Sequence, residues 1–423
     1  MSTAMLETGA HGGPIGWYSE LAVSERRTFW GCFLGWVLDA MDVQIYGLAL
    51  GAIGATFALD KTQSGLIGTV TLFTSAFGGW LAGLVSDRVG RVRMLQLTVA
   101  WFAIFTFLCG LAQNYPQFLV LRALMGFGFG GEWAAGAVLM GEVIRARHRG
   151  KAVGCVQAGW AVGWGVALIL WTLLSSTLAQ EHAWRVLFML GIAPAFLVFF
   201  VRRFVHEPEV FIACRAGDEK GAGNPLEIFS PAMLKTTILC ALLATGAQGG
   251  YYAITTWLPS FLKDERNLSV VGSFPYLAII IAGSFLGYIA SAYLCDLIGR
   301  RANFVLFAAA SFVIALIYTQ IPMDDSLMLV LGLPLGFFAS GVFSGMGPFL
   351  TENFPTRMRG SGQGFSYNFG RGISAWNVTF VGMLSARLSL GHSIGVFAGI
   401  AYALVVIAAL LLPETKGREL TAG

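Results

Sequence analysis

The stretch GLVSDRVGRVR, residues 83–93, and the stretch AYLCDLIGRRA, residues 292–302, decide how this chain folds. Each follows a long apolar run and places an aspartate three residues before a Gly-Arg pair. The two aspartates, Asp87 and Asp296, are 209 residues apart in a chain of 423 residues. A motif that returns after about half the chain indicates an internal repeat.

A second pair of motifs repeats at nearly the same spacing. The segments GEVIRARHRGKAVG, residues 141–154, and TENFPTRMRGSGQG, residues 351–364, share the pattern E-x6-R-G, and Glu142 and Glu352 are 210 residues apart. Two independent motifs at nearly one offset predict a parallel repeat. Such repeats are typical of transporters, whose substrate binds near the membrane midplane between the two repeats.

The composition is that of an integral membrane protein. Hydrophobic residues make up 56% of the chain, charged residues only 12%, and the mean hydropathy is +0.70, whereas a soluble domain of this size needs far more charged surface. The six cysteines form no CxxC pair and the five histidines lack metal-ligand spacing. We therefore expect no disulfide framework, no metal site and no cofactor. Since no convergent nucleophile or acid–base cluster is recognisable, we do not expect an enzyme.

Apolar runs long enough to cross a bilayer as helices, about 20 residues each, recur twelve times. They lie near 28–53, 63–86, 94–112, 116–142, 152–178, 184–204, 234–262, 271–295, 302–321, 326–352, 361–387 and 393–413. The sequence therefore predicts an all-α membrane protein with twelve transmembrane helices in two six-helix halves. Its predicted parts are an N-terminal tail (1–27), a first bundle (28–204), a polar linker (205–233), a second bundle (234–413) and a C-terminal tail (414–423).

The basic residues predict the orientation of the chain in the membrane. Of the 27 lysines and arginines, 20 fall on the side of the two tails and the linker, five fall on the opposite side, and Arg122 and Arg371 lie inside apolar runs. Since basic residues are retained on the cytoplasmic side, both termini and the linker are predicted to be cytoplasmic, with the bundles in the cytoplasmic (inner) membrane.

Several motifs resemble those of the major facilitator superfamily. They are GxxxDRxGR after the second run with its echo after the eighth, RALMGFGFGGEW in the fourth run and PETKGREL after the twelfth. Within that superfamily, GWVLDAMD, GFGGEWAAG, GGYYAITTWLPSFL and GQGFSYNFGR are most similar to the metabolite:proton symporters, which include sialate/lactate and aromatic-acid carriers. The echo departs from the first copy at Ala292 and Leu297, so we expect its contribution to gating to be weaker. The fifth run lacks the proline associated with drug antiporters.

Two acids in the first run, Asp39 and Asp42, cost free energy to bury. They lie on one face of a helix, since residues i and i+3 are neighbours, and Asp42 falls close to the midplane. The resemblance implies that Asp42 and Arg122 match the first-helix Asp and fourth-helix Arg of proton-coupled sugar porters, and so form a proton switch. The alternative is that one or both acids simply satisfy a structural arginine. Glu132, near the middle of the fourth run, is either a second proton carrier or a structural acid.

Arg371 lies about 11 residues into the eleventh run, roughly 16 Å from the predicted cytoplasmic edge. Since guanidinium binds carboxylate in a bidentate manner, Arg371 is a candidate partner for an anionic substrate; the alternative is an ion pair with Asp39, Asp42 or Glu132. Other polar and aromatic residues at matching depth are predicted to line the cavity, although each is equally explained as a contact between helices. They are Gln157, Trp160, Gln248, Tyr251, Tyr252, Tyr367 and Asn368.

The charged residues of the loop motifs are interpreted as gates, which pair and separate at the cytoplasmic helix ends. They are Asp87, Arg88, Arg91, Glu142, Arg149, Asp296, Arg300, Glu352 and Arg359. The predicted function is proton-coupled import of a small organic anion (a monocarboxylate, sialate or aromatic acid) by rocker-switch alternating access, driven by the proton gradient. The alternatives are a sugar or polyol symporter, an organic-anion exchanger or exporter, and a membrane sensor without transport. The expected partners are the anion, protons and lipid, with no nucleic acid, and the chain is expected to be a monomer.

Overall fold

The computed structural model describes residues 16–89, 91–143, 146–193, 195–196, 225–355 and 359–416. Every regular element within these ranges is helical. The first helix group comprises α1 (Gly16–Ser19), α2 (Val23–Phe57), α3 (Lys61–Val89), α4 (Arg91–Gly110), α5 (Tyr115–Val143), α6 (Ala146–Gln157), α7 (Gly159–Thr177) and α8 (Gln180–Leu190). The second helix group comprises η1 (Pro225–Phe229), α11 (Leu234–Asp264), α12 (Val270–Ile298), α13 (Arg300–Gln320), α14 (Asp325–Gly341), α15 (Met346–Asn353), α16 (Arg359–Ser374), α17 (Trp376–Leu384) and α18 (Leu390–Leu411).

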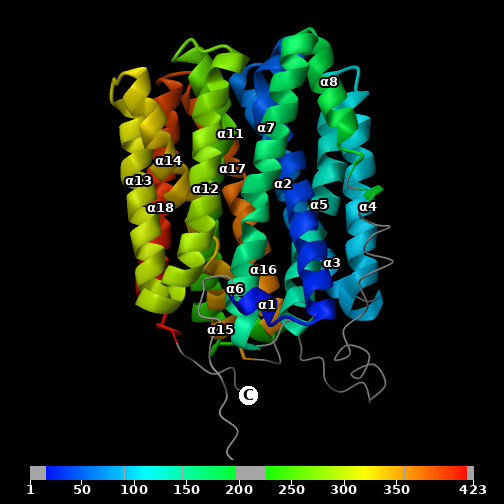
Figure 1. Cartoon of the computed structure of the whole chain (residues 1–423), viewed down its shortest axis with the longest axis vertical. Helices are drawn as coiled ribbons and strands as arrows, with labels where there is room; N and C mark the ends of the chain where they lie inside the picture. The colour runs from blue at the N-terminus through cyan, green and yellow to red at the C-terminus, as the bar shows by residue number, and fades with distance from the viewer. Residues whose placement is uncertain are drawn as a thin grey trace, which may run out of the picture.

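The long helices run side by side along one axis, with the two groups next to each other (Figure 1). We name the two ends of this bundle after Figure 1: the short helices α1 and α15 lie at the lower end, and α2 runs from there to the upper end. The helices α11, α16 and α17 lie in the middle of the view, between α13 and α18 on one side and α4 and α5 on the other. The face shared by the two groups is therefore built mainly from α2, α3 and α7 of the first group and α11, α12, α16 and α17 of the second.

The same pairs of helices pack in both groups. In the first, α3 packs along α5 and α2 along α7; in the second, α12 packs along α14 and α11 along α16. Glycines let the backbones touch in the α3–α5 and α12–α14 pairs. A Cβ atom on Gly130 of α5 would lie 1.7 Å from the carbonyl oxygen of Ser75 on α3, and one on Gly336 of α14 would lie 1.8 Å from the carbonyl oxygen of Ile280 on α12. Such close approach through small residues is how membrane helices gain packing energy without a hydrophobic drive between them.

Three predicted runs are each divided into two helices. The breaks fall at Ala158 between α6 and α7, at 342–345 between α14 and α15, and at Ala375 between α16 and α17. At the second break the backbone tightens into i→i+3 bonds, from Phe343 N–H to Ser340 O at 3.1 Å and from Met346 N–H to Phe343 O at 3.1 Å. No proline or charge stands at these breaks in the sequence.

Eight helices within the described residues are long and apolar enough to cross a membrane. These eight include α2 and α18. Many large apolar side chains of the eight helices are exposed on the outside of the bundle, such as Leu173, Val330 and Ile400. This outer surface is suited to contact with lipid. α11 and α16 are not among the eight; α16 has only 16 residues, and the two helices carry the buried polar residues Gln248 and Arg371. The chain is therefore a multi-pass membrane protein, while the count of twelve spans stays a prediction.

The two groups touch at the upper end of the bundle. Thr69 on α3 donates a hydrogen bond to the carbonyl oxygen of Ala375 at 2.8 Å, and its hydroxyl lies 2.6 Å from that of Thr379 on α17. Lys61 and Asp264 form an ion pair at 3.1 Å across the same seam. The upper end is therefore closed in this conformation.

Candidate functional site

Arg371 lies inside the bundle at the end of α16 and is only 1% exposed. Its Nε donates a hydrogen bond to Gln248 Oε1 of α11 at 3.3 Å. Its guanidinium lies over two aromatic rings, 4.9 Å from the centroid of Phe129 and 5.0 Å from that of Tyr367. Nη1 is buried and has no hydrogen-bond partner among the described residues. Since a buried donor without a partner is costly, this nitrogen is a candidate ligand for an anion.

Gln248 positions the arginine from α11. Its Nε2 donates to the carbonyl oxygen of Tyr367 at 2.9 Å while its Oε1 accepts from Arg371. Both ends of the amide are thus engaged between α11 and α16, which fixes the orientation of the guanidinium. Among the described residues, no ion pair within 4.0 Å joins Arg371 to Asp42. The side chain of Glu132, another acid of the alternative reading, lies outside the described part of the chain.

Tyr251, one turn further along α11, connects the second helix group to the first. Its hydroxyl accepts a hydrogen bond from Trp160 Nε1 of α7 at 2.7 Å and another from Gln44 Nε2 of α2 at 3.3 Å. The Trp160 ring lies 5.1 Å from that of Trp36 and 6.4 Å from that of Phe129. The aromatic surface thus extends from Tyr251 to the ring beneath Arg371.

The remaining predicted lining residues are all buried, but they differ in what they contact. Tyr252 lies within electrostatic range of both Arg371 and Asp39, which places it at the centre of the site. Asn368 donates to the carbonyl oxygen of Gly364 at 3.0 Å, and its side chain packs against Gly79 of α3. Asn368 therefore contacts a neighbouring helix, which is the alternative that the sequence left open to a place in the cavity lining. Gln157 is buried at the end of α6, directly before the break.

Asp42 is fully buried on α2, and Thr106 Oγ1 of α4 donates to its Oδ2 at 3.0 Å. Arg122 is also buried and lies within electrostatic range of Asp42, with its guanidinium 4.8 Å from the centroid of the Tyr46 ring. No direct ion pair within 4.0 Å joins Asp42 to Arg122. In this conformation Thr106 binds one carboxylate oxygen of Asp42, while Asp42 Oδ1 and Arg122 Nη1 are buried without a hydrogen-bond partner among the described residues.

A second charged cluster lies at the lower end of the second helix group. Arg300 binds Glu352 through two nitrogens, at 3.0 and 3.2 Å, and contacts Asp296 at 2.6 Å. These three predicted gating residues thus come together, with Arg300 as the partner of Glu352. The side chain of Arg359, which shares the E-x6-R-G pattern with Glu352, lies outside the part of the chain that the structure describes.

Glu414, in the PETKGREL motif, closes this cluster from the C-terminal side. Its carboxylate accepts from the backbone N–H groups of Arg300 at 2.9 Å and Arg301 at 3.0 Å, at the start of α13. Burial raises the pKa of Glu414, but these bonds and two more from Thr415 and Lys416 outweigh it and hold the pKa below its ordinary value. The segment after α18 is thereby attached to the helix that follows the second loop motif.

Seven predicted residues lie outside the described side chains. They are Asp87, Arg88, Arg91, Glu132, Glu142, Arg149 and Arg359. Among the residues that the structure describes, no group of three or more metal-ligating side chains occurs, and the described cysteines form no disulfide.

Sequence reasoning missed several members of the site. Phe129 and Thr106 are uncharged residues within apolar runs, so nothing in the sequence distinguishes them from packing residues. Gln44 does carry a signal, as an amide in the run that holds Asp39 and Asp42. The pairing of Lys61 with Asp264 joins the two helix groups. The sequence alone does not show how these helix groups lie against each other.

Comparison with known proteins identifies the family. The family model of the Major Facilitator Superfamily matches residues 32–376. The chain belongs to this superfamily. Two relatives from bacteria extend the match: a "Probable 4-methylmuconolactone transporter" of Cupriavidus pinatubonensis, 43% identical over 95% of this chain and 93% of the relative, and a "Cis,cis-muconate transport protein" of Acinetobacter baylyi, 32% identical over 92% and 95%.

A solved structure agrees with this superfamily assignment at the level of the fold. The proton:xylose symporter XylE, bound to 6-bromo-6-deoxy-D-glucose, has a TM-score of 0.76 with 18% identity, covering 94% of this chain and 97% of its own. At that identity the likeness concerns the fold alone. The comparisons confirm the family predicted from the motifs, and a transporter rather than an enzyme.

Proposed function

We propose that this superfamily member imports a small organic anion together with protons. The observation that supports this proposal best is the environment of Arg371. Its guanidinium is buried between the Phe129 and Tyr367 rings, and Nη1 has no hydrogen-bond partner among the described residues. An arginine held in this way offers bidentate hydrogen bonds to a carboxylate. A neutral sugar would leave the buried charge uncompensated, which is unfavourable in a membrane interior.

The relatives support an unsaturated organic acid as cargo. The names of two of them give 4-methylmuconolactone and cis,cis-muconate, both small unsaturated acids rich in oxygen. The rings of Trp36, Phe129 and Trp160 provide flat apolar surface next to Arg371, which suits a conjugated carbon chain. We therefore place this chain's substrate in the same chemical class, ahead of lactate or sialate.

Proton coupling is assigned to the buried acids of α2. Asp42 and Arg122 are both buried in the first helix group and lie within electrostatic range of each other. An ionised carboxylate in this position needs a positive partner, whereas a protonated one does not. Loading a proton on Asp42 would thus release Arg122. Asp39 lies three residues before Asp42 on α2 and within electrostatic range of Tyr252. Glu132 is retained as a candidate second proton carrier.

Alternating access would arise from rocking of the two helix groups, which we take to be the six-helix halves 28–204 and 234–413. The recurrence of the same helix pairs in both groups supports this layout. The clustered Asp296, Arg300 and Glu352 would form the lower gate. In this proposal the lower end faces the cytoplasm of a cell whose inner membrane holds the protein as a monomer, and the proton gradient, with no cofactor, drives uptake.

The test is uptake of radiolabelled cis,cis-muconate into vesicles that contain the purified protein. With an inward proton gradient we expect accumulation that an uncoupler abolishes; accumulation insensitive to the uncoupler would exclude coupling and leave an exchanger. Asp42→Asn should lose uphill uptake and keep substrate counterflow. Arg371→Lys keeps the positive charge but loses the paired guanidinium donors, and Arg371→Gln removes the charge as well. Uptake should therefore fall from the wild type to Arg371→Lys and further to Arg371→Gln. Equal uptake rates in these three proteins would show that Arg371 does not bind the anion.

A further inference from the structure

Tyr46 lies one turn after Asp42 on α2, and its side chain contacts two different parts of the first helix group. The guanidinium of Arg122 lies over its ring, with Cζ 4.8 Å from the ring centroid. Its hydroxyl donates to the carbonyl oxygen of Ser64 on α3, where the backbone N–H of Gly68 is a second partner. The side chain is only 2% exposed. Tyr46 therefore connects the buried charges of α2 and α5 to α3.

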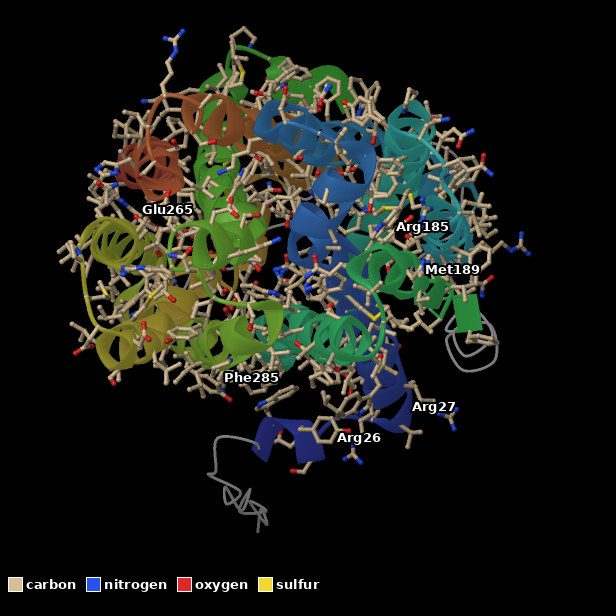
Figure 2. All side chains as sticks on the ribbon, turned by 90° about the horizontal axis from the view of Figure 1, so that it is seen from above. Arg26, Arg27, Arg185, Met189, Glu265 and Phe285 are labelled. Carbon is tan, nitrogen blue, oxygen red and sulfur yellow. The ribbon has the colours of Figure 1, made fainter. Side chains whose placement is uncertain are left out.

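The part of α3 that binds this hydroxyl also closes the upper end of the molecule. Seen from above, α3 (blue) lies beside α17 (orange) of the second helix group (Figure 2). A Cβ atom on Gly68 would lie 3.4 Å from Tyr46 Cε1 and 3.0 Å from Val378 Cγ1 on α17. Thr69, the next residue, makes the hydrogen bonds across the seam. Residues 64–69 of α3 thus contact both Tyr46 and the second helix group.

Arg122 has two alternative partners, Tyr46 and Asp42. Asp42 lies within electrostatic range, but no ion pair within 4.0 Å joins it to Arg122. An ionised Asp42 attracts the guanidinium, and this attraction competes with the aromatic contact, which is favourable for a desolvated cation. A protonated Asp42 leaves the guanidinium over the Tyr46 ring, with the Phe188 ring of α8 at 5.8 Å. The structure combines this position of Arg122 with a closed upper end.

The other titratable side chains that the structure places within electrostatic range of these residues are Cys109 and Tyr115. Cys109 of α4 lies near both Asp42 and Arg122, and Tyr115 of α5 lies near Tyr46. A thiol and a phenol are ordinarily uncharged at neutral pH. The position of Arg122 therefore depends chiefly on the charge of Asp42.

We propose that Tyr46 is the positioning residue through which protonation of Asp42 controls closure of the upper end. While Asp42 is protonated, Arg122 stays over the Tyr46 ring and Tyr46 holds α3 against α17. When Asp42 is ionised, Arg122 moves toward the carboxylate, the ring loses its cation, and the seam between α3 and α17 loosens. This inference rests on the proposed function, because it takes Asp42 as the proton site.

Electrostatics explains why the cation matters for α3. A positive charge over the ring makes the Tyr46 hydroxyl a stronger donor, because it stabilises negative charge on the phenolic oxygen. The hydrogen bond to Ser64 is therefore strongest while Arg122 stays in place. A side chain fixed at both ends also holds a single position, whereas release of one end restores conformational freedom that opposes the other contact.

The experiment measures the ratio of closed to open molecules at the upper end. Spin labels on unnatural amino acids at Ala55 and Ala386, both exposed there, leave Cys109 in place, and pulsed electron resonance is recorded on the full chain in lipid nanodiscs at pH 9, which favours ionised Asp42. Asp42→Asn mimics the protonated acid, since its amide is neutral and similar in shape. It should raise the closed-to-open ratio about tenfold, the effect of a buried cation–aromatic contact. An unchanged ratio would overturn proton control by Asp42, and with it the proposed coupling itself.

Substitutions of Tyr46 then test the inference separately. Tyr46→Leu removes the ring, so adding Asp42→Asn should change the ratio by less than about twofold. Tyr46→Phe keeps the ring but loses the bond to Ser64, and should reduce the response to about threefold. Tyr318→Phe is the matched control, because it removes another buried hydroxyl on α13 of the second group, and should keep the full response.

A merely structural Tyr46 would give a different result. Its substitution would lower thermal stability but leave the tenfold response to Asp42→Asn intact. A full response in both Tyr46→Leu and Tyr46→Phe would therefore refute the role of Tyr46, while the response of the wild type would still support Asp42 as the proton site. If Tyr46→Leu does not fold, the nearly isosteric Tyr46→Phe decides alone.

Discussion

Gly65, on α3, touches the backbone of α17 across the upper end of the molecule, so a single added methyl group should force this end open. A Cβ atom on Gly65 would lie 2.8 Å from Thr379 Cα and 2.8 Å from the carbonyl oxygen of Val378. This is about 0.6 Å short of the 3.4 Å at which ordinary contact begins. The obstructing atoms are backbone, so no rotamer change can relieve the clash.

The expected size of the effect follows from the packing. Overpacking of this kind costs about 1–3 kcal/mol, which corresponds to a shift of about 5- to 150-fold against the conformation with a closed upper end. The substitution Gly65→Ala does not weaken α3 itself, since alanine is favoured over glycine in a helix by about 1 kcal/mol. The strain is therefore confined to the contact between the two helix groups.

Distances across the upper end provide the assay. Spin labels at Ala55 and Ala386, both exposed at this end, report the separation by pulsed electron resonance in a background whose native cysteines are replaced. Gly65→Ala should move the distribution toward longer distances. The matched control is Gly364→Ala on α16, where an added Cβ meets nothing within 4 Å. An unchanged distribution in Gly65→Ala, or the same change in the control, would refute the reasoning.

Three further substitutions test other contacts. Thr106→Val removes the donor to Asp42 and should lower the free energy of unfolding by about 1–3 kcal/mol, a loss that shrinks in an Asp42→Leu background; full additivity in a double-mutant cycle would contradict the contact. Lys61→Gln should change thermal stability by at most about 1 kcal/mol, because the paired side chains are 43% and 40% exposed; a larger loss would contradict this. The pKa of Glu414 is depressed in the folded state, so its stabilisation is present at neutral pH and is lost as the pH falls below about 5. Glu414→Gln should therefore lower the melting temperature at pH 7 and flatten its decline in acid, and parallel pH curves for the two proteins would disprove the role.

The sequence predicts the family, the helical class and the depth of the buried charges. Arg371 was located by counting residues from the predicted end of its helix, and the structure buries it as expected. Its aromatic neighbour Phe129 could not be found in the same way, since it lies 242 residues earlier in the chain on another helix. Local patterns determine which residues enter the membrane, whereas contacts between helices depend on how the helices cross.

The loop motifs likewise identify charged residues in the sequence but not the residues with which they pair. The repeated loop motifs contain Asp296, Arg300 and Glu352, which the structure brings together. They did not reveal that Arg300 is the partner of Glu352, because that pairing requires the start of α13 to face the end of α15. The breaks at Ala158 and Ala375 were likewise hidden, since the small residues that permit them are common throughout the chain.

The glycine contacts between α3 and α5, and between α12 and α14, determine which positions of this protein can be substituted without loss of folding. Positions such as Gly130 and Gly336 admit no side chain at all, so the crossed pairs are closed to variation. Trp160 lies on α7, two residues after the break at Ala158, and Phe343 lies in the break after α14; both contact Tyr251. We expect a mutant library to yield folded carriers with altered cargo at these two positions, and to yield only misfolded chains at the glycines.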